Sequence, residues 1–176
     1  MGSMYQNMAL RNVELLIARI AGTMPKEYSA ETLFHDSAVV VTGANNPLTR
    51  RRKVKLAELV DEPWIQQGSD HYFASLVAGA FRSEGCAPPR LTVATTSAAL
   101  RNELLATGYF LTVIPGFALR LPHRHPFLRA LPVELPRLRN PIAIITFRDR
   151  SLSPLAQLFC ERVRAITKPL AIAQRK

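Results

Sequence analysis

The chain has 176 residues, of which 23 are Lys or Arg, 13 are Asp or Glu and two are Cys. This length suits one domain or two small lobes, and 48% apolar and 20% charged residues are typical of a globular protein. Two cysteines cannot build a disulfide framework, no Cys/His cluster has zinc spacing, and no apolar run has the length of a membrane helix. The N-terminus also lacks the pattern of a signal peptide. These features exclude secreted, zinc-finger and membrane-spanning classes and favour a reduced, cytoplasmic setting.

The formal net charge of +10 is unevenly distributed, with basic residues gathered at Arg50–Lys55 and over residues 120–176. One interpretation is a surface that contacts phosphates. The other is a solvated basic face that favours acidic partners or simply solubility. No aromatic residues that could stack on bases alternate with the Arg50–Lys55 run, and this favours the solvated face.

Short apolar runs rich in branched residues predict buried strands. They alternate along the chain with turn signals such as Asn45-Asn46-Pro47 and Asp61-Glu62-Pro63. The expected strands are Val13–Ala18, Ser37–Val41, Trp64–Gln67, Leu91–Ala94, Phe110–Ile114, one within Phe127–Leu135, and Ile142–Phe147, with a short apolar piece at Leu56–Val60.

Three helices are predicted from periodicity and end signals. The clearest has an apolar stripe from Phe73 to Phe81, with Ser69 or Asp70 as its N-cap and Gly85 as its end. The second, Ala98–Ala106, follows a Thr95–Ser97 cap and ends at Gly108. The last begins at Pro154, carries a stripe from Leu155 to Ile166, and is expected to end before Pro169.

Alternating strands and helices predict an α/β fold with parallel sheets and right-handed crossovers. Residues 47–117 contain two such strand–helix–strand units. The strands before and after them must pair with each other to avoid bare edges. The expected topology is therefore two lobes joined by two crossings, with a cleft between them.

In open α/β sheets, ligands bind beyond the carboxyl ends of the strands, where helices begin. Two segments have this position, Gly68–His71 and Thr95–Ser97. Both offer hydroxyls and backbone N–H groups that suit a carboxylate or a phosphate. The alternative is that these residues only cap helices, and the sequence leaves both functions open.

Signals for catalysis and for metal binding are weak. Ser69, Asp70 and His71 are adjacent, whereas the members of a catalytic triad usually come from separate loops. Cys86 is best explained as a bystander, and His123 with His125 lacks a third metal ligand. No P-loop, G-x-G-x-x-G or G-x-S-x-G motif is present. We therefore expect no catalytic residues, no metal and no cofactor.

An ordered set of segments resembles the effector-binding domain of LysR-type transcriptional regulators and covers nearly the whole chain. One departure is Phe110, which stands where the family usually has the second glycine of a G-x-G that begins at Gly108. The matching segments are Val13–Arg19, Leu33–Asp36, Val39–Val41, Asn46–Leu48, Val54–Leu59, Glu62–Ile65, Gly108–Gly116 and Arg150–Phe159.

The resemblance implies a fold like that of type 2 periplasmic binding proteins, with two Rossmann-like lobes. Lobe I would hold residues 1–43 and 140–176, and lobe II residues 44–139. Relative to the family, the helix-turn-helix domain, the linker helix and the first strand–helix unit of lobe I are missing. The effector would lie between the lobes, and the positions carried over from the family are Arg19, Gln67, Gly68, Ser69, Thr95, Thr96, Pro115 and Phe117.

The function that the resemblance implies is effector sensing by a cytoplasmic regulator without enzymatic activity. A small acidic metabolite would bind between the lobes, and Arg19 could form a fork on its carboxylate. The protein would form a homodimer or tetramer, contact DNA only through the missing N-terminal domain, and have no membrane partner. The alternatives are a solute-binding protein of the same fold, a basic nucleic-acid-binding module and, last, a hydrolase.

Overall fold

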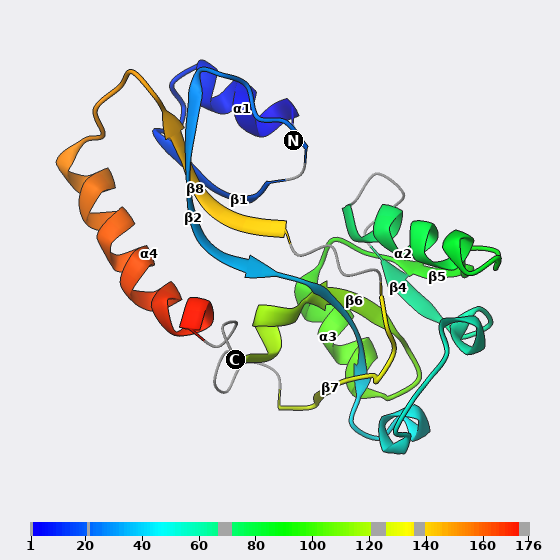
Figure 1. Cartoon of the computed structure of the whole chain (residues 1–176). Helices are drawn as coiled ribbons and strands as arrows, with labels where there is room; N and C mark the ends of the chain where they lie inside the picture. Colours follow the sequence, from blue (N-terminus) through cyan, green and yellow to red (C-terminus); the bar gives the residue numbers. More distant parts are fainter. Residues whose placement is uncertain (1, 21, 67–71, 121–125, 136–139, 173–176) are drawn as a thin grey trace. The chain divides into compact units, whose positions relative to one another are not determined.

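The computed structural model describes residues 2–20, 22–66, 72–120, 126–135 and 140–172 (Figure 1). Its internal contacts divide the chain into two compact units. Unit 1 comprises Met1–Asp36 and Arg139–Lys176, and unit 2 comprises Ser37–Leu138. The chain therefore crosses between the units twice, and each unit has its own sheet and core.

Unit 1 is built on a three-stranded sheet of order β1-β8-β2 in which both outer strands run antiparallel to the central one. The strands come from the two ends of the chain, so the expected pairing of early strands with a late strand is confirmed. The elements of unit 1 are α1 (Gly2–Ala9), β1 (Leu15–Arg19), β2 (Tyr28–Asp36), β8 (Asn140–Phe147) and α4 (Pro154–Ile172).

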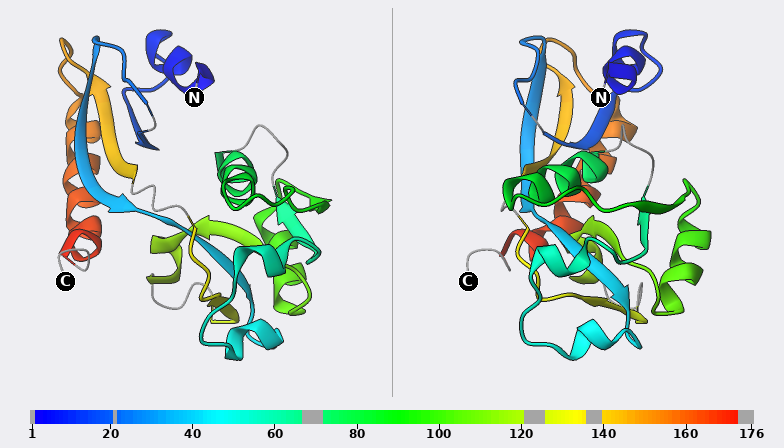
Figure 2. Two further views of the ribbon diagram at one scale, coloured as in Figure 1. Left: turned by 45° about the vertical axis from the view of Figure 1, so that its right-hand side comes forward. Right: turned by 90° about the vertical axis from the view of Figure 1, so that its right-hand side faces the viewer.

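The two helices of unit 1 lie on opposite sides of this sheet (Figure 2). Because successive residues of a strand face opposite sides, Ala143 and Ile145 pack in one cluster with Met8 of α1 and Tyr28 of β2. The helix α4 packs along β2 on the other face of the sheet. Both faces of β8 are thereby covered, which explains why this strand reads as a continuous apolar run.

Unit 2 contains an antiparallel sheet of order β6-β3-β7 and a parallel pair of strands, β4 and β5. The pair joins the larger sheet through the segment just before β6, since Ile65 N donates to Leu111 O at 2.8 Å and Leu111 N to Pro63 O at 2.9 Å. The elements are β3 (Ala38–Gly43), β4 (Trp64–Gln66), α2 (Tyr72–Ser83), β5 (Leu91–Ala94), α3 (Ala98–Ala106), β6 (Thr112–Pro115) and β7 (Leu128–Ala130), with 3-10 helices η1 (Pro47–Arg50), η2 (Leu56–Leu59) and η3 (Gly116–Arg120).

The predicted parallel sheets are correct for only part of unit 2. The strands β4 and β5 and the segment at Leu111 run parallel, as two strand–helix–strand units require. The strands β6 and β7, however, pair antiparallel with β3, and so do all the strands of unit 1. The reason is that the two chain crossings bring β3 and β8 into sheets whose other strands run the opposite way.

The core of unit 2 forms beneath α2, whose predicted stripe is buried at Leu76, Val77, Ala80 and Phe81. Trp64 lies in the same cluster, with none of its surface exposed and its ring edge-on to Phe81. On the other side, α3 packs closely on β3, because a Cβ at Gly43 would collide with the backbone carbonyl of Leu105. A residue larger than glycine at this position would push the helix away from the sheet.

One strand was missed, and three expectations about elements and boundaries are corrected. The whole of β2 was missed, because its exposed polar residues hide the strand signal. Residues 1–43 were assigned to lobe I, but β3 pairs with β6 and β7 and lies in unit 2. The piece at Leu56–Val60 is the 3-10 helix η2. Pro169 lies inside α4, which continues to Ile172 and buries Leu170.

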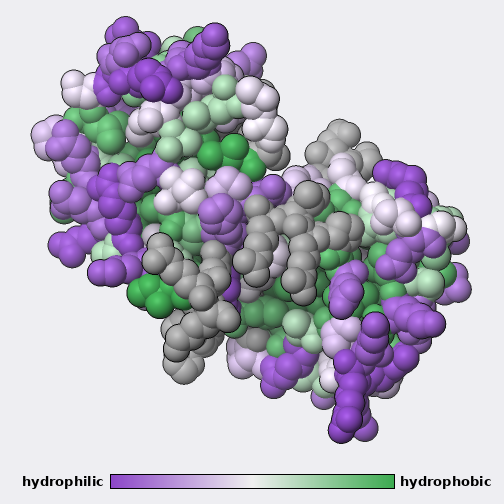
Figure 3. Space-filling view, viewed as in Figure 1, coloured by the Kyte–Doolittle hydropathy of each residue, from purple (hydrophilic) through white to green (hydrophobic). Residues whose placement is uncertain are grey.

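The basic run at Arg50–Lys55 lies at the end of unit 2 that carries η1 and η2. All five of its basic residues are exposed, whereas Val54 between them is buried in the core. Hydrophilic side chains gather over this end in the space-filling view (Figure 3). Within the described part of the chain, no helix combines the length and apolar character needed to cross a membrane.

Candidate ligand-binding site

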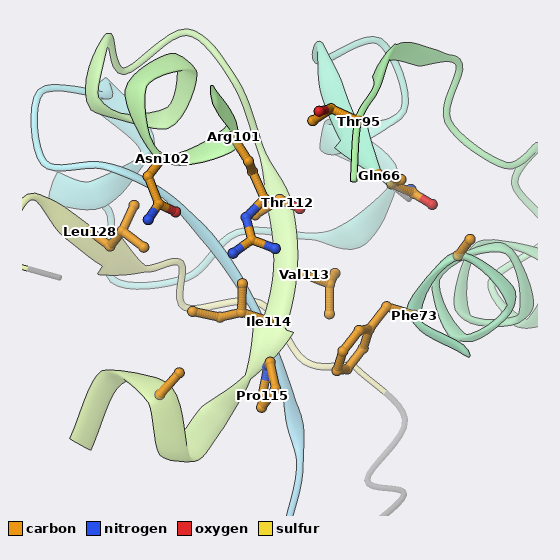
Figure 4. A pocket seen from close by; sticks show the side chains of 12 residues that line it. Gln66, Phe73, Thr95, Arg101, Asn102, Thr112, Val113, Ile114, Pro115 and Leu128 are labelled. Carbon is orange, nitrogen blue, oxygen red and sulfur yellow. The ribbon is translucent and has the colours of Figure 1, made fainter. Parts of the chain in front are cut away.

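A cavity of about 180 Å³ opens in unit 2, and we call it the α3 cavity. Residues of β6 form one wall, and α3, α2, the ends of β4 and β5, and η3 supply the rest (Figure 4). Its volume is close to that of a cavity that holds a single six-membered ring, roughly 150 Å³. The lining residues are Gln66, Phe73, Ala74, Thr95, Arg101, Asn102, Thr112, Val113, Ile114, Pro115, Ala118 and Leu128.

The wall formed by β6 is rigid and mostly apolar. Thr112, Val113 and Ile114 are buried, and Pro115 ends the strand. The hydroxyl of Thr112 donates to the carbonyl of Ile65 at 2.7 Å, so this group keeps only acceptor capacity toward a ligand. The strand thus supplies shape and one polar atom.

The loop after β5 brings Thr95 into the cavity and starts α3. The backbone N–H of Thr95 donates to Gln66 O at 3.2 Å, and the Thr95 hydroxyl oxygen accepts from Ser97 N at 3.1 Å. Ser97 is the N-cap, with its Oγ accepting from Leu100 N at 3.3 Å. The capping function predicted for this segment is therefore confirmed. The hydroxyl proton of Thr95 can still be donated toward the cavity.

Arg101 and Asn102 extend from α3 into the same cavity (Figure 4). The Nε of Arg101 and the Oδ1 of Asn102 are buried, and neither has a hydrogen-bond partner among the described residues. Burial lowers the pKa of the Arg101 guanidinium from its ordinary value, because removal from water disfavours the charged form. The cavity thus contains a hydrogen-bond donor on a cation, the Nε–H of Arg101, and an acceptor, the Oδ1 of Asn102. Neither has a partner among the described residues.

The structure brings together two of the eight predicted site residues, Thr95 and Pro115. Thr96 is exposed and does not line the α3 cavity. Phe117 is partly buried in η3 and is also absent from the lining. Gln67, Gly68 and Ser69 lie outside the described residues, as does Asp70, the other predicted N-cap of α2.

Arg19 lies in unit 1, where it ends β1 and forms an ion pair with Asp36. Its Nη2 is 3.1 Å from Asp36 Oδ2, and its Nη1 donates to the Asp36 carbonyl at 3.3 Å. Fork-like contact with a carboxylate was predicted for this arginine, and in the structure it contacts a carboxylate of its own unit. Its contact with an effector stays a prediction.

Sequence reasoning missed Arg101 and Asn102, although a signal was present. Leu105 is fully buried, and Arg101 and Asn102 precede it by four and three residues. Residues at these spacings share one face of a helix, so a cation and an amide stand on the buried face of α3. Leu100, in contrast, is 49% exposed. In this helix, the spacing of Arg101 and Asn102 from the buried Leu105 was the signal for the polar side of the cavity.

A second cavity, in unit 1, has Glu14 and Arg150 among its lining residues, and both are engaged by other residues of the unit. It is lined by residues from the loops around Glu14 and Arg150. Both carboxylate oxygens of Glu14 accept from Ser153, one from its backbone N–H and one from its hydroxyl. These bonds lower the pKa of Glu14. Arg150 lies 3.9 Å from the centre of the Phe147 ring. We therefore place the candidate site in the α3 cavity.

The groups that line the α3 cavity are suited to binding. No group of three or more His, Cys, Asp or Glu side chains there could hold a metal ion. Cys160 is buried in α4, and Cys86 is partly buried after α2. The α3 cavity offers hydroxyls, amides and one guanidinium around an apolar wall, which suits a small polar ligand.

Comparison with known proteins gives a consistent result. The sequence model of the LysR substrate binding domain matches residues 5–167. The transcriptional dual regulator GltC of Bacillus subtilis (strain 168) is 26% identical over 160 residues, which are 88% of this chain and 52% of that protein. The chain therefore spans about half the length of this relative.

Solved structures show the same fold. The CcmR regulatory domain of Synechocystis PCC6803, in complex with 2-PG, has a TM-score of 0.73 and 18% identity, with 94% of this chain and 79% of that chain covered. The effector binding domain of QuiR, in complex with shikimate, has a TM-score of 0.70 and 16% identity, with 95% and 78% covered. The α/β fold of the type 2 periplasmic-binding class is thereby confirmed.

Proposed function

This chain belongs to the LysR substrate binding domain family, and from that premise we propose that it senses a small organic acid in its α3 cavity. The observation that carries the proposal is the meeting of Thr95 and Pro115, two positions expected from the family, with the cation of Arg101 in one cavity. A ring-sized acid matches both the cavity's volume and its charge.

Sensing requires that the ligand bind two arrangements of the regulator with different affinity. We propose that the chain performs this step within a homodimer or tetramer of a cytoplasmic regulator. DNA contact would come from a helix-turn-helix domain outside the present sequence. The chain would have no catalytic activity and need no cofactor, because its function is a shift between populations.

Two of the solved neighbours are in complex with small molecules, 2-PG and shikimate. Shikimate is a ring acid, and its chemistry places it within the class proposed for this cavity. Both compounds therefore belong in a ligand screen. A solute-binding protein and a nucleic-acid-binding module are less favoured, because the chain matches regulators and the Arg50–Lys55 run is an exposed face.

A thermal-shift screen of small aromatic and sugar-derived acids tests the proposal. An acid at 100 times its dissociation constant stabilises the folded state by about 2.7 kcal/mol, which raises Tm by several degrees. Ala118→Leu adds three carbons to the cavity lining and should abolish this shift. Ala99→Leu, on the exposed side of α3, is the matched control and should preserve it.

Two results would contradict the proposal. If no acid raises Tm, the chain does not sense this class of compound. If the shift survives in Ala118→Leu as it does in Ala99→Leu, the ligand binds elsewhere.

A further inference from the structure

The α3 cavity holds a positive charge that the described residues do not neutralise. The Nε of Arg101 is buried without a hydrogen-bond partner, and none of the ion pairs among the described residues involves this side chain. In Figure 4 the guanidinium extends from α3 toward Thr112 and Ile114 on β6. It therefore lies against the wall of the cavity, with the side chain partly buried and its Nε shielded from water.

This arrangement costs the fold stability, because the buried Nε–H loses its hydration and gains no hydrogen bond in return. An arginine that served only the structure would be expected to bond a carboxylate or carbonyl. Arg51, Arg148 and Arg164 all do so elsewhere in the chain. The orientation of Arg101 is explained if its partner is a ligand.

Asn102 needs a hydrogen-bond donor from the ligand, whereas Arg101 needs an acceptor. The buried Oδ1 of Asn102 accepts no hydrogen bond from the described residues and needs a donor. Arg101 and Asn102 are neighbours on α3 and line the same cavity. One compound that satisfies both must carry an anionic group and, close to it, an O–H or N–H donor.

The charges in the cavity indicate whether the ligand's donor to Asn102 is a hydroxyl or an ammonium group. None of the described lining residues is acidic, whereas one is a guanidinium. An ammonium group would be repelled by Arg101 and would find no counter-charge. A neutral hydroxyl is not repelled by Arg101 and needs no counter-charge.

From this geometry we infer that Arg101 and Asn102 select a hydroxylated carboxylic acid about the size of one ring, Arg101 binding the carboxylate and Asn102 accepting from the hydroxyl. This inference rests on the proposed function and names its ligand class. Arg101 is then the main determinant of charge selectivity. Asn102 distinguishes hydroxy acids from plain acids.

Isothermal titration with a matched ligand series tests the inference on the purified protein. The series is benzoate, its 2-, 3- and 4-hydroxy derivatives, the corresponding amides, and shikimate. We expect at least one hydroxy acid to bind roughly 5-fold or more tightly than its parent acid or its amide, since a hydrogen bond to a buried orphan group is worth about that factor.

Single substitutions assign the two preferences to residues. Arg101→Met should weaken carboxylate binding roughly 10- to 100-fold, to the level of the amides, and Arg101→Lys should restore part of the loss. Asn102→Leu should remove the preference for the hydroxyl and keep the preference for the carboxylate. Arg162→Met, an exposed substitution on α4 with the same change in charge, should bind like the wild type.

A stability measurement shows whether the variants fold. Because Arg101→Met removes a partly buried guanidinium whose Nε has no hydrogen-bond partner among the described residues, its Tm without ligand should equal or exceed that of the wild type. A large fall in Tm would identify Arg101 as a structural residue and overturn the inference.

The outcomes separate this inference from the proposed function. If an acid binds the wild type and Arg101→Met alike, the inference is wrong and the sensing function stands. If benzoate binds as tightly as all its hydroxy derivatives, the assignment of Asn102 is wrong. If only amides bind, the charge selectivity is wrong. If no compound in this series or in the wider acid screen binds, the proposed function fails together with the inference.

Discussion

Arg19 and Asp36 form an ion pair at the ends of two strands, β1 and β2, that lie on opposite sides of β8. The side chain of Asp36 is 1% exposed and that of Arg19 is 12% exposed, with 3.1 Å between Nη2 and Oδ2. The pair therefore ties both edge strands of unit 1 together in a site largely shielded from water. This gives Arg19 a structural role beside any role in ligand binding.

Asp36→Ala should destabilise the protein by about 3–5 kcal/mol, because it leaves a mostly buried guanidinium without its carboxylate. Chemical denaturation followed by circular dichroism measures the change. Glu31→Ala is the control, since Glu31 pairs with Arg164 at a site where both side chains are 49% exposed. That loss should be small. Equal losses in the two variants would show that the Arg19–Asp36 pair is no stronger than a surface pair.

Asn46 and Gly108 connect the start of η1 to the end of α3, and both should be intolerant of alanine. Asn46 Nδ2 donates to Gly108 O at 2.7 Å while its Oδ1 caps Leu48 N at 2.9 Å. Asn46→Ala should cost about 2 kcal/mol through the lost cap and the buried bond. Gly108 has φ +80°, and a Cβ there would lie 3.2 Å from Asn46 N. Gly108→Ala should therefore cost roughly 1–2 kcal/mol.

Gly79→Ala is the matched control for Gly108→Ala. Gly79 lies inside α2, and a Cβ added there would meet no atom within 4 Å. Alanine should stabilise the helix by about 0.5–1 kcal/mol, because it restricts the unfolded chain. Urea denaturation of the three variants checks the signs. Destabilisation by Gly79→Ala would contradict the packing described for α2.

Trp64 is the single tryptophan of the chain and reports on unit 2. It is fully buried, and its Nε1 donates to Leu59 O at 2.8 Å. Its fluorescence should be blue-shifted in the folded protein and shift to red as unit 2 unfolds. Trp64→Phe should cost about 1–3 kcal/mol, because the carbonyl of Leu59 is left buried without a donor. An emission maximum typical of exposed indole in the folded protein would contradict this placement.

Three carboxylates predict a loss of stability in acid. Hydrogen bonds from Ser153, Arg164 and Arg51 lower the pKa values of Glu14, Glu31 and Glu58, respectively, from the ordinary value of 4.5. A carboxyl with a lowered folded-state pKa stabilises the fold above its unfolded pKa. This contribution is lost as the pH falls from about 4.5 through the folded pKa. Tm measured from pH 7 to pH 3 should therefore decline below about pH 4.5.

Glu14→Gln provides the test of this assignment. The amide keeps the shape of the side chain but does not titrate, so the slope of Tm against pH below 4.5 should become shallower. An unchanged slope would show that Glu14 contributes nothing to the acid transition.

Local signals predicted the elements whose ends are encoded nearby. The helix Ala98–Ala106 was predicted with its bounds because Ser97 caps it and Gly108, at φ +80°, follows it. The apolar run Ile142–Phe147 is contained in β8. Pro169 was interpreted as a stop, yet α4 continues past it. A proline removes one backbone donor locally, whereas the burial of Leu170 is a tertiary contact that no local pattern reveals.

In the candidate site, too, local sequence signals predicted one residue and tertiary packing revealed another. Thr95 was predicted because it follows a strand and precedes a helix, which is a position along the chain. Arg101 was not predicted, because a charge on a helix is usually solvated. Only the packing of α3 against the strands of unit 2 partly buries that side chain and removes its Nε from water.

The sequence by itself determined most of the helices and strands and the basic, globular character of the chain, which follow from local pattern and composition, and it pointed to the family through an ordered set of matching segments. Tertiary structure decided which strands pair antiparallel, where β3 belongs, and which polar side chains lose water. Pairing and burial depend on residues far apart in the chain, such as Thr112 and Ile65, whose hydrogen bond forms only once β4 and β6 lie together. The 180 Å³ cavity and its uncompensated cation are products of that assembly.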